Sequence, residues 1–208
     1  MFFAPTSARG SFVVHFTSNP VTDFGIWGRG YTEAAKRLRE SLLSGPRGGD
    51  NDTYPVVFLY RHALELYLKG IMVAANHVVG LKSQLEFVEA LRSDHRLLPL
   101  FQAASRLLLR SFPDDPGISD FLAKLKKVVT DLNGVDPGSF SFRYPVNTEF
   151  ERPAGGSITM GLIELGQGMD EVLEAFDTIE TALQVEGDDL EEALAYLEHD
   201  DHDRYAQS

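Results

Sequence analysis

The sequence contains no cysteine and no long uninterrupted apolar run. Without cysteine, the chain can form neither a disulfide framework nor a thiolate metal site. Its most apolar stretch, residues 54–81, is interrupted by Arg61, Glu65 and Lys69, so we expect no membrane span. The N-terminal segment MFFAPTSARG also lacks the basic-then-apolar order of a signal peptide. We therefore expect a cytoplasmic protein.

Several common catalytic motifs are missing as well. The sequence has no P-loop, no GxSxG elbow and no HExxH pair. The segment GIWGRG at residues 25–30 is not a dinucleotide fingerprint, because no clear βαβ unit surrounds it, and we interpret it as a turn. The segment HDDHD at residues 199–203 is rich in ligand types, but a chain end offers them no fixed geometry. We predict neither a metal site nor a cofactor.

Basic residues are scarce in the last part of the chain, so the net charge of −12 is unevenly spread. Residues 1–152 hold 18 Lys and Arg against 16 Asp and Glu, a net charge of +2. Residues 153–208 hold Arg204 against 15 acidic residues, a net charge of −14. This asymmetry is typical of a solvated helical face or of an acidic docking surface for a protein partner. Because acidic groups repel phosphates, any nucleotide or RNA should bind through residues 1–152.

The apolar residues of the sequence show helical periodicity. Apolar residues recur at helical spacing in successive segments, and some boundaries are marked, as where Asp115-Pro116 opens a helix and Asn133-Gly134 ends it. We predict an all-α fold, a bundle of about six helices. The predicted helices span residues 32–43, 55–79, 83–91, about 99–108, 115–133 and 157–184, with a short acidic helix at 190–197.

With 208 residues, the chain is long enough for one sizeable core. We expect an irregular N-terminal segment at residues 1–30, with a candidate strand at 11–16. Residues 31–185 should form the helical bundle, and residues 186–208 an acidic C-terminal helix and tail. A turn-rich connector, with a short extended piece at 140–144, should precede the last long helix.

That last long helix carries an apolar seam whose spacing alternates between three and four residues. The seam favours packing within the bundle, and the alternative is a homodimer interface, as in a structural oligomer subunit. Its residues are Leu162, Leu165, Met169, Val172, Phe176, Ile179 and Leu183.

The helix at residues 55–79 is apolar on almost every side, which predicts a central position in the bundle. Its polar residues are therefore informative. Arg61, Glu65 and Lys69 follow one another at four-residue spacing, so they share a stripe, with His62 beside it. Two interpretations are open. The stripe is a hydrogen-bonded network that fixes the helix against its neighbours, or it lines a pocket for a phosphate, a nucleotide or an RNA backbone.

Two residues outside this helix are further candidates for the same site. His95 and Arg143 each lie at a junction between predicted elements. In the pocket interpretation, Arg61, Lys69 and Arg143 are the donors to the phosphate. The candidate binding residues are therefore Arg61, Glu65, Lys69 and Arg143, and the candidate catalytic residues are His95 and His62.

Three segments of the chain carry a family resemblance: FLYRHALELYLKGIM (residues 58–72), DHRLLPLF (residues 94–101) and DPGSFSFRYPVN (residues 136–147). The first resembles the leading helix of HEPN-type helical domains. The second is similar to the H-D-L-x-x-L segment of the same proteins, with His95 as the matching histidine, and the third resembles a connector found in uncharacterised bacterial members. The resemblance covers about a fifth of the chain. It implies an α-helical bundle, often dimeric, from a group that includes toxin ribonucleases and non-catalytic binding proteins.

The catalytic members of that family carry an Arg followed a few residues later by a His on a late helix. Here the matching pair is Arg9 and His15, ahead of the first predicted helix, and residues 157–184 contain neither Arg nor His. The resemblance therefore implies a non-catalytic binding or interaction module, in a bacterial stress or defence system. The alternative hypothesis is a metal-independent ribonuclease that uses His95 or His62 as general acid and base, with Arg61 and Arg143 stabilising the phosphate.

Overall fold

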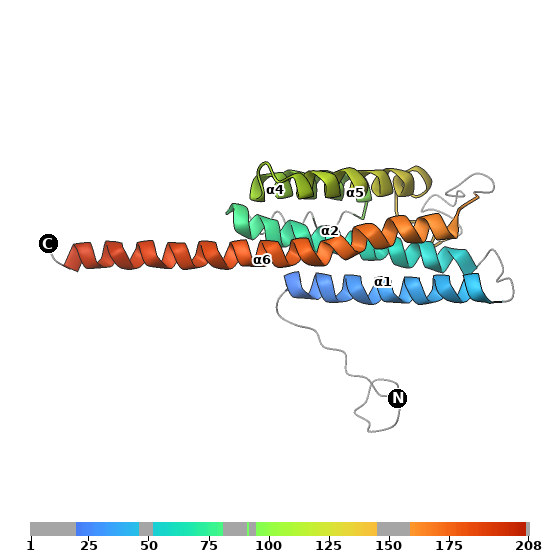
Figure 1. The fold of residues 1–208 in the computed structure, drawn as a ribbon, viewed down its shortest axis with the longest axis horizontal. Coiled ribbons are helices and arrows are strands. Elements are labelled where there is room, and N and C mark those ends of the chain that lie inside the picture. The colour runs from blue at the N-terminus through green and yellow to red at the C-terminus, as the bar shows by residue number, and fades with distance from the viewer. Residues whose placement is uncertain (1–19, 46–51, 81–90, 92–94, 145–158, 207–208) are drawn as a thin grey trace, which may run out of the picture.

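The protein is a bundle of long α-helices, seen in a computed structural model (Figure 1). The structure describes residues 20–45, 52–80, 91, 95–144 and 159–206; for residues 20–22 and 193–206 it describes the backbone alone. The helices are α1 (Pro20–Ser44), α2 (Thr53–Val79), α4 (Leu97–Ser111), α5 (Pro116–Val135) and α6 (Leu162–Ala206). The all-α prediction is confirmed, with five helices in the described ranges where about six were expected.

Helix α1 begins earlier than predicted. It starts at Pro20, so the glycines at residues 25–30 lie inside a helix, and both the predicted turn there and the irregular segment up to residue 30 are wrong for residues 20–30. The physical reason is close packing. A Cβ atom at Gly28 would lie 2.9 Å from the ring of Tyr67 in α2, so the glycine lets the two helices approach. The candidate strand at 11–16 and most of the predicted helix at 83–91 lie outside the described residues.

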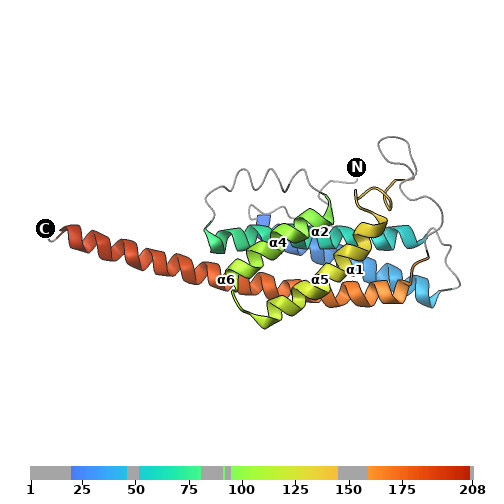
Figure 2. The same cartoon turned by 90° about the horizontal axis from the view of Figure 1, so that it is seen from above.

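Helix α2 is central, as its all-round apolar sequence predicts. It packs against α1, α4 and α6, and Figures 1 and 2 show it between α1 on one side and the α4–α5 pair on the other. Tyr60, Ala63, Leu64 and Leu68 of α2 are fully buried in the core. The fold therefore depends on α2 more than on any other helix, because most of the core forms around it.

Helix α6 is one continuous element of 45 residues, so the separate short helix predicted at 190–197 is wrong. Its predicted seam faces the core of the same chain: Met169, Val172, Phe176 and Leu183 are each at most 2% exposed. Packing within the bundle is therefore confirmed for these four residues. Beyond the seam, α6 runs on past the end of the bundle (Figures 1 and 2).

Ion pairs connect α1 with α6 along the bundle. Arg29 pairs with Asp177 at 2.9 Å, Lys36 with Glu174 at 3.1 Å, and Arg39 with Asp170 at 2.8 Å. Residue numbers rise in α1 as they fall in α6, so the two helices are antiparallel. Exposed ion pairs of this kind contribute about 1 kcal/mol or less. They fix the register of the two helices more than they stabilise them.

The ion pair of Arg39 and Asp170 differs from the other two, because the buried Tyr60 is hydrogen-bonded to both of its members. The hydroxyl of Tyr60 donates to Asp170 at 2.9 Å and accepts from Arg39 at 2.7 Å, which closes a triad over α1, α2 and α6. Burial raises the pKa of the Tyr60 hydroxyl, and the hydrogen bond to Asp170 raises it further.

Among the described residues of the chain, no helix is apolar enough over a sufficient length to cross a membrane.

We expect Asp170→Ala to lower the free energy of unfolding by about 2 kcal/mol, because it leaves the Tyr60 hydroxyl and the Arg39 guanidinium without their acceptor. Urea denaturation followed by circular dichroism measures this loss. The matched control is Glu174→Ala on the same helix. Its side chain is 71% exposed, so its loss should stay below about 1 kcal/mol. Equal losses in the two variants would contradict the role of the triad.

Candidate functional site

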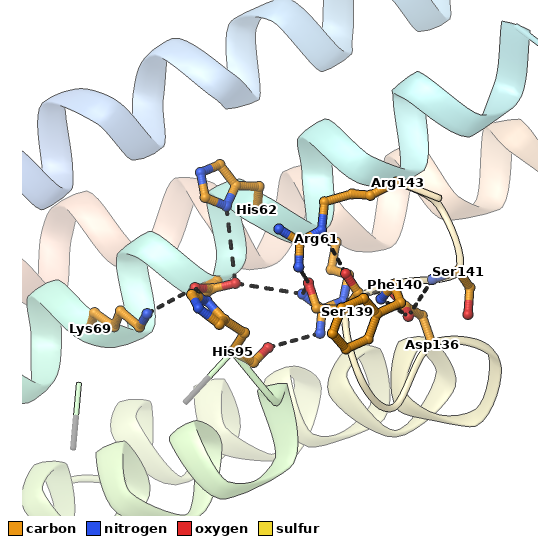
Figure 3. Close-up of polar contacts among 10 residues, drawn as sticks. Arg61, His62, Lys69, His95, Asp136, Ser139, Phe140, Ser141 and Arg143 are labelled. Carbon is orange, nitrogen blue, oxygen red and sulfur yellow. Dashed lines mark hydrogen bonds and ion pairs between the residues drawn. The ribbon is translucent and has the colours of Figure 1, made fainter. Parts of the chain in front are cut away.

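The polar stripe of α2 is buried. Arg61 is 2% exposed, Glu65 3% and Lys69 6%, because α2 has neighbours on most of its sides. Unpaired charges in such a place would cost several kcal/mol each. Figure 3 shows that residues from three parts of the chain meet at this stripe: α2, the residues before α4, and the turns that follow α5.

Arg61 joins all three parts. Its guanidinium donates to the backbone oxygen of His95 at 2.9 Å and to Oγ of Ser139 at 2.6 Å. Its Nε lies 3.0 Å from Oδ2 of Asp136, but the N–H is not aligned with that carboxylate, so this contact is an ion pair without a hydrogen bond. Burial lowers the pKa of Arg61, while the charges of Asp136 and Glu65 act in the opposite direction. The guanidinium stays charged, and its contacts are internal.

Glu65 is the acceptor at the centre of the stripe. Lys69 donates to its Oε1 at 2.8 Å, and Nδ1 of His95 lies 2.8 Å from the same oxygen. An ionised carboxylate only accepts hydrogen bonds, so Nδ1 of His95 carries the proton. Burial raises the pKa of Glu65, but the hydrogen bonds from Lys69 and His95 outweigh burial and hold the pKa below its ordinary value. The carboxylate is therefore charged at neutral pH.

The turns after α5 supply the remaining contacts. Oδ1 of Asp136 accepts from the backbone N–H of Phe140 at 2.8 Å and from that of Ser141 at 3.0 Å. Ser139 has a left-handed backbone, with φ of 68°, a conformation that costs free energy in residues other than glycine. Residues 141–143 form a turn, so the extended piece predicted at 140–144 is wrong. The hydrogen bonds of Asp136 explain the difference, because two successive backbone N–H groups donate to one carboxylate oxygen and an extended strand does not allow this.

Three candidate residues lie at the edge of this buried network. The side chain of His95 is 49% exposed and that of His62 is 28% exposed, and Arg143 is exposed. Nδ1 of His62 lies 4.0 Å from Oε2 of Glu65, whereas Nδ1 of His95 lies 2.8 Å from the other carboxylate oxygen, Oε1. Burial lowers the pKa of His62, and the charges of Arg143, Lys69 and Arg61 add to this effect while Glu65 opposes it. The His62 ring is therefore mainly neutral at neutral pH.

Arg143 and His62 both lie against the ring of Phe58. The His62 ring is stacked on Phe58, with centroids 5.6 Å apart and an interplanar angle of 9°. The guanidinium carbon of Arg143 lies 5.9 Å from the Phe58 centroid, 5.8 Å from that of Phe140 and 6.0 Å from that of Tyr144. Cations at this distance are attracted to the faces of aromatic rings. The rings therefore hold Arg143 at the surface beside the network.

The structure thus brings together all six candidate residues, in two different environments. Arg61, Glu65 and Lys69 are buried and pair internally, which is the arrangement that the network interpretation expects. His62, His95 and Arg143 lie where a ligand can reach them. Sequence analysis missed Asp136 and Ser139, because nothing in the turn-forming segment DPGS indicates that it contacts a helix that lies 75 residues earlier, at Arg61.

Comparison of the chain with protein-family models, with curated proteins and with solved structures gave no match. In the residues for which side chains are described, no group of three or more His, Asp or Glu side chains is placed to hold a metal ion. The side chains of the candidate ligands at 199–203 lie outside the described residues, although their backbone belongs to α6.

We expect Glu65→Gln to lower the free energy of unfolding by about 3–5 kcal/mol, because it leaves Lys69 and Arg61 buried without their shared carboxylate. Thermal or urea denaturation measures the change. Glu171→Gln is the matched control, since its ion pair with Lys124 is exposed to solvent and its loss should change the free energy of unfolding much less. A loss below about 1 kcal/mol for Glu65→Gln would show that the stripe is not a paired network.

Proposed function

We propose that the chain is a non-catalytic, HEPN-like binding module of a bacterial stress or defence system. The observation that carries this proposal is the burial of Arg61. A ribonuclease needs a cation that reaches the phosphate in the transition state, and Arg61 is 2% exposed and engaged by His95, Ser139 and Asp136. In this function the charged network holds α2, α4 and the turns after α5 in place, and the surfaces around them bind partners.

The positions of the three HEPN-like segments support the same proposal. Residues 58–72 lie in α2, residues 94–101 include the start of α4, and residues 136–144 form the turns after α5. All three meet at Arg61 and Glu65. A resemblance spread over distant parts of the sequence thus corresponds to one connected cluster. Such a cluster suits a structural role that a non-catalytic member would keep after losing its catalytic pair.

A protein partner is proposed for the acidic end of α6. Past the buried Gly187, this helix carries the exposed residues Asp188, Asp189, Glu191 and Glu192. The sequence of residues 186–206 continues this excess, with Arg204 as its one cation. A basic partner would gain from this charge and would be steered toward it. The proposed homodimer would use a surface other than Met169, Val172, Phe176 and Leu183, because these four residues of the seam are buried within the chain.

Deleting residues 186–208 should weaken the capture of basic partners from a bacterial lysate several-fold at low salt, because it removes the acidic end of the helix. Quantitative mass spectrometry of the captured proteins measures the change. The matched control neutralises two acidic residues elsewhere on α6, Glu171→Gln with Glu174→Gln, and should retain capture. If the deletion leaves capture unchanged, the docking surface is not at this end of α6.

One observation favours the alternative, a metal-independent ribonuclease. His95 Nδ1 is held by the buried Glu65 carboxylate, and about half of the His95 side chain is exposed. An imidazole oriented in this way can exchange a proton through its other nitrogen. His62 lies beside the same carboxylate, and Arg143 is the exposed cation that would take the role that the buried Arg61 cannot. The two functions therefore differ in one measurable property, RNA cleavage.

We expect the purified protein to leave RNA uncut in the presence of EDTA, because residues 157–184 carry no Arg–His pair and Arg61 is buried. Gel analysis of a labelled single-stranded RNA measures this, with wild type beside His95→Ala and Arg143→Ala. Cleavage by wild type that both substitutions abolish would establish the ribonuclease and refute the non-catalytic function. Cleavage that survives both substitutions would point to a contaminating nuclease.

A further inference from the structure

The apolar seam of α6 continues past the point where the bundle ends. Leu183, inside the bundle, is 1% exposed, whereas Leu190, two helical turns later on the same line, is 38% exposed. Helix α6 then runs on beyond the bundle (Figures 1 and 2). In the sequence, the spacing of three and four residues continues at Ala193 and Leu197. We define the α6 extension as residues 186–206, the part of the helix that follows the buried seam.

The beginning of the α6 extension is fixed to α2. Nε2 of His77 lies 3.1 Å from Oε1 of Glu191, and a Cβ atom at Gly187 would lie 2.9 Å from Cδ2 of the same His77 ring. The glycine therefore lets the last turn of α2 approach α6 closely where the bundle ends. Because these two contacts are one helical turn apart, they hold the stretch of α6 that carries Leu190. A partner that binds there meets a helix that is already ordered, which lowers the entropic cost of binding.

Acidic side chains lie on both sides of Leu190. Helical geometry places Asp189 on one side of it and Glu191 on the other, with Glu186 one turn before it, and all three are exposed. The sequence of the α6 extension contains nine acidic residues, with Arg204 as its one Lys or Arg. An apolar line between charged edges is the pattern by which one helix recognises another, because the apolar line packs and the edges select the charge of the partner.

The charge of the α6 extension determines which occupant fits it. A second copy of the chain would bring another strongly acidic helix against the first, and like charges across a helix pair repel. Nucleic acids and anionic membrane surfaces are repelled for the same reason. A helix with an apolar face and cationic edges has neither disadvantage, because it can cover Leu190 while its cations pair with the acidic edges.

We propose that the α6 extension binds a basic amphipathic helix of a partner protein, which packs its apolar face on Leu190 and pairs its cations with Glu186 and Asp189. The proposal rests on the non-catalytic binding function and names the structural class of the basic partner. Burial of apolar surface supplies affinity, and the charged edges supply orientation and a fast association rate. A basic segment without an apolar face would gain the second contribution alone.

Fluorescence anisotropy of the full chain with two labelled synthetic peptides tests the proposal. The amphipathic peptide has three heptads with leucine at a and d and lysine at e and g, and the scrambled peptide has the same composition with its leucines spread around the helix. Wild type should bind the amphipathic peptide at least about tenfold more tightly, because the scrambled peptide has no face to pack on Leu190. Circular dichroism should show that the amphipathic peptide is helical when bound.

Leu190→Ser should weaken binding of the amphipathic peptide about fivefold or more and leave binding of the scrambled peptide unchanged. Its matched control is Leu109→Ser, because Leu109 of α4 is 49% exposed and lies in another helix. Glu186→Gln combined with Asp189→Asn should weaken both peptides, and increasingly so at low salt. The control for charge is Glu171→Gln combined with Glu174→Gln, in the part of α6 that lies in the bundle.

Three outcomes would overturn the helical partner. They are equal binding of the two peptides, equal effects of Leu190→Ser and Leu109→Ser, and self-association of the chain in sedimentation that Leu190→Ser abolishes, which would assign Leu190 to a second copy. Equal binding of both peptides would still leave an acidic docking surface, whereas binding of neither would remove that surface as well. None of these measurements involves RNA cleavage, so they are distinguishable from failure of the non-catalytic function.

Discussion

The structure depends on the requirement that charges buried on α2 be paired. Arg61, Glu65 and Lys69 cannot be solvated where α2 places them, and each unpaired ion would cost several kcal/mol. Glu65 pairs with Lys69 on the same helix, but Arg61 also needs groups from elsewhere. It finds them in the backbone of His95 and in Asp136 and Ser139. The residues before α4 and the turns after α5 must therefore come to the middle of α2, and this requirement positions both.

The pairing of the buried charges also determines which side chains of the cluster are exposed at the surface. Glu65 draws the two histidines toward its carboxylate, one at 2.8 Å and one at 4.0 Å, without burying either completely. Ser139 holds Arg143 through its backbone oxygen and its hydroxyl. The same contacts that neutralise the buried charges thus orient His62, His95 and Arg143 at the exposed edge of the network.

The sequence predicts the parts of this arrangement that depend on one helix at a time. The all-round apolar pattern of α2 indicates its central place, and four-residue spacing puts Arg61, Glu65 and Lys69 on one stripe. The glycines at 25–30 led to the wrong prediction of a turn. Glycine destabilises an isolated helix, but it permits the close approach of two packed helices, as at Gly28 beside Tyr67. The partners Asp136 and Ser139, and the triad of Tyr60, Arg39 and Asp170, join residues more than twenty positions apart, and no local pattern encodes them.

The acidic excess of α6 lies away from the network around Arg61. In the bundle, Asp170, Glu174 and Asp177 are neutralised by cations of α1, so the acidic excess lies toward the free end of the helix. That end and the turns after α5 lie toward opposite ends of the long axis of the molecule (Figure 1). The proposed docking surface at the end of α6 is therefore separate from the network around Arg61. Helix α2 contacts both regions, because it carries Glu65 in the network and His77, whose Nε2 lies 3.1 Å from Oε1 of Glu191 in α6.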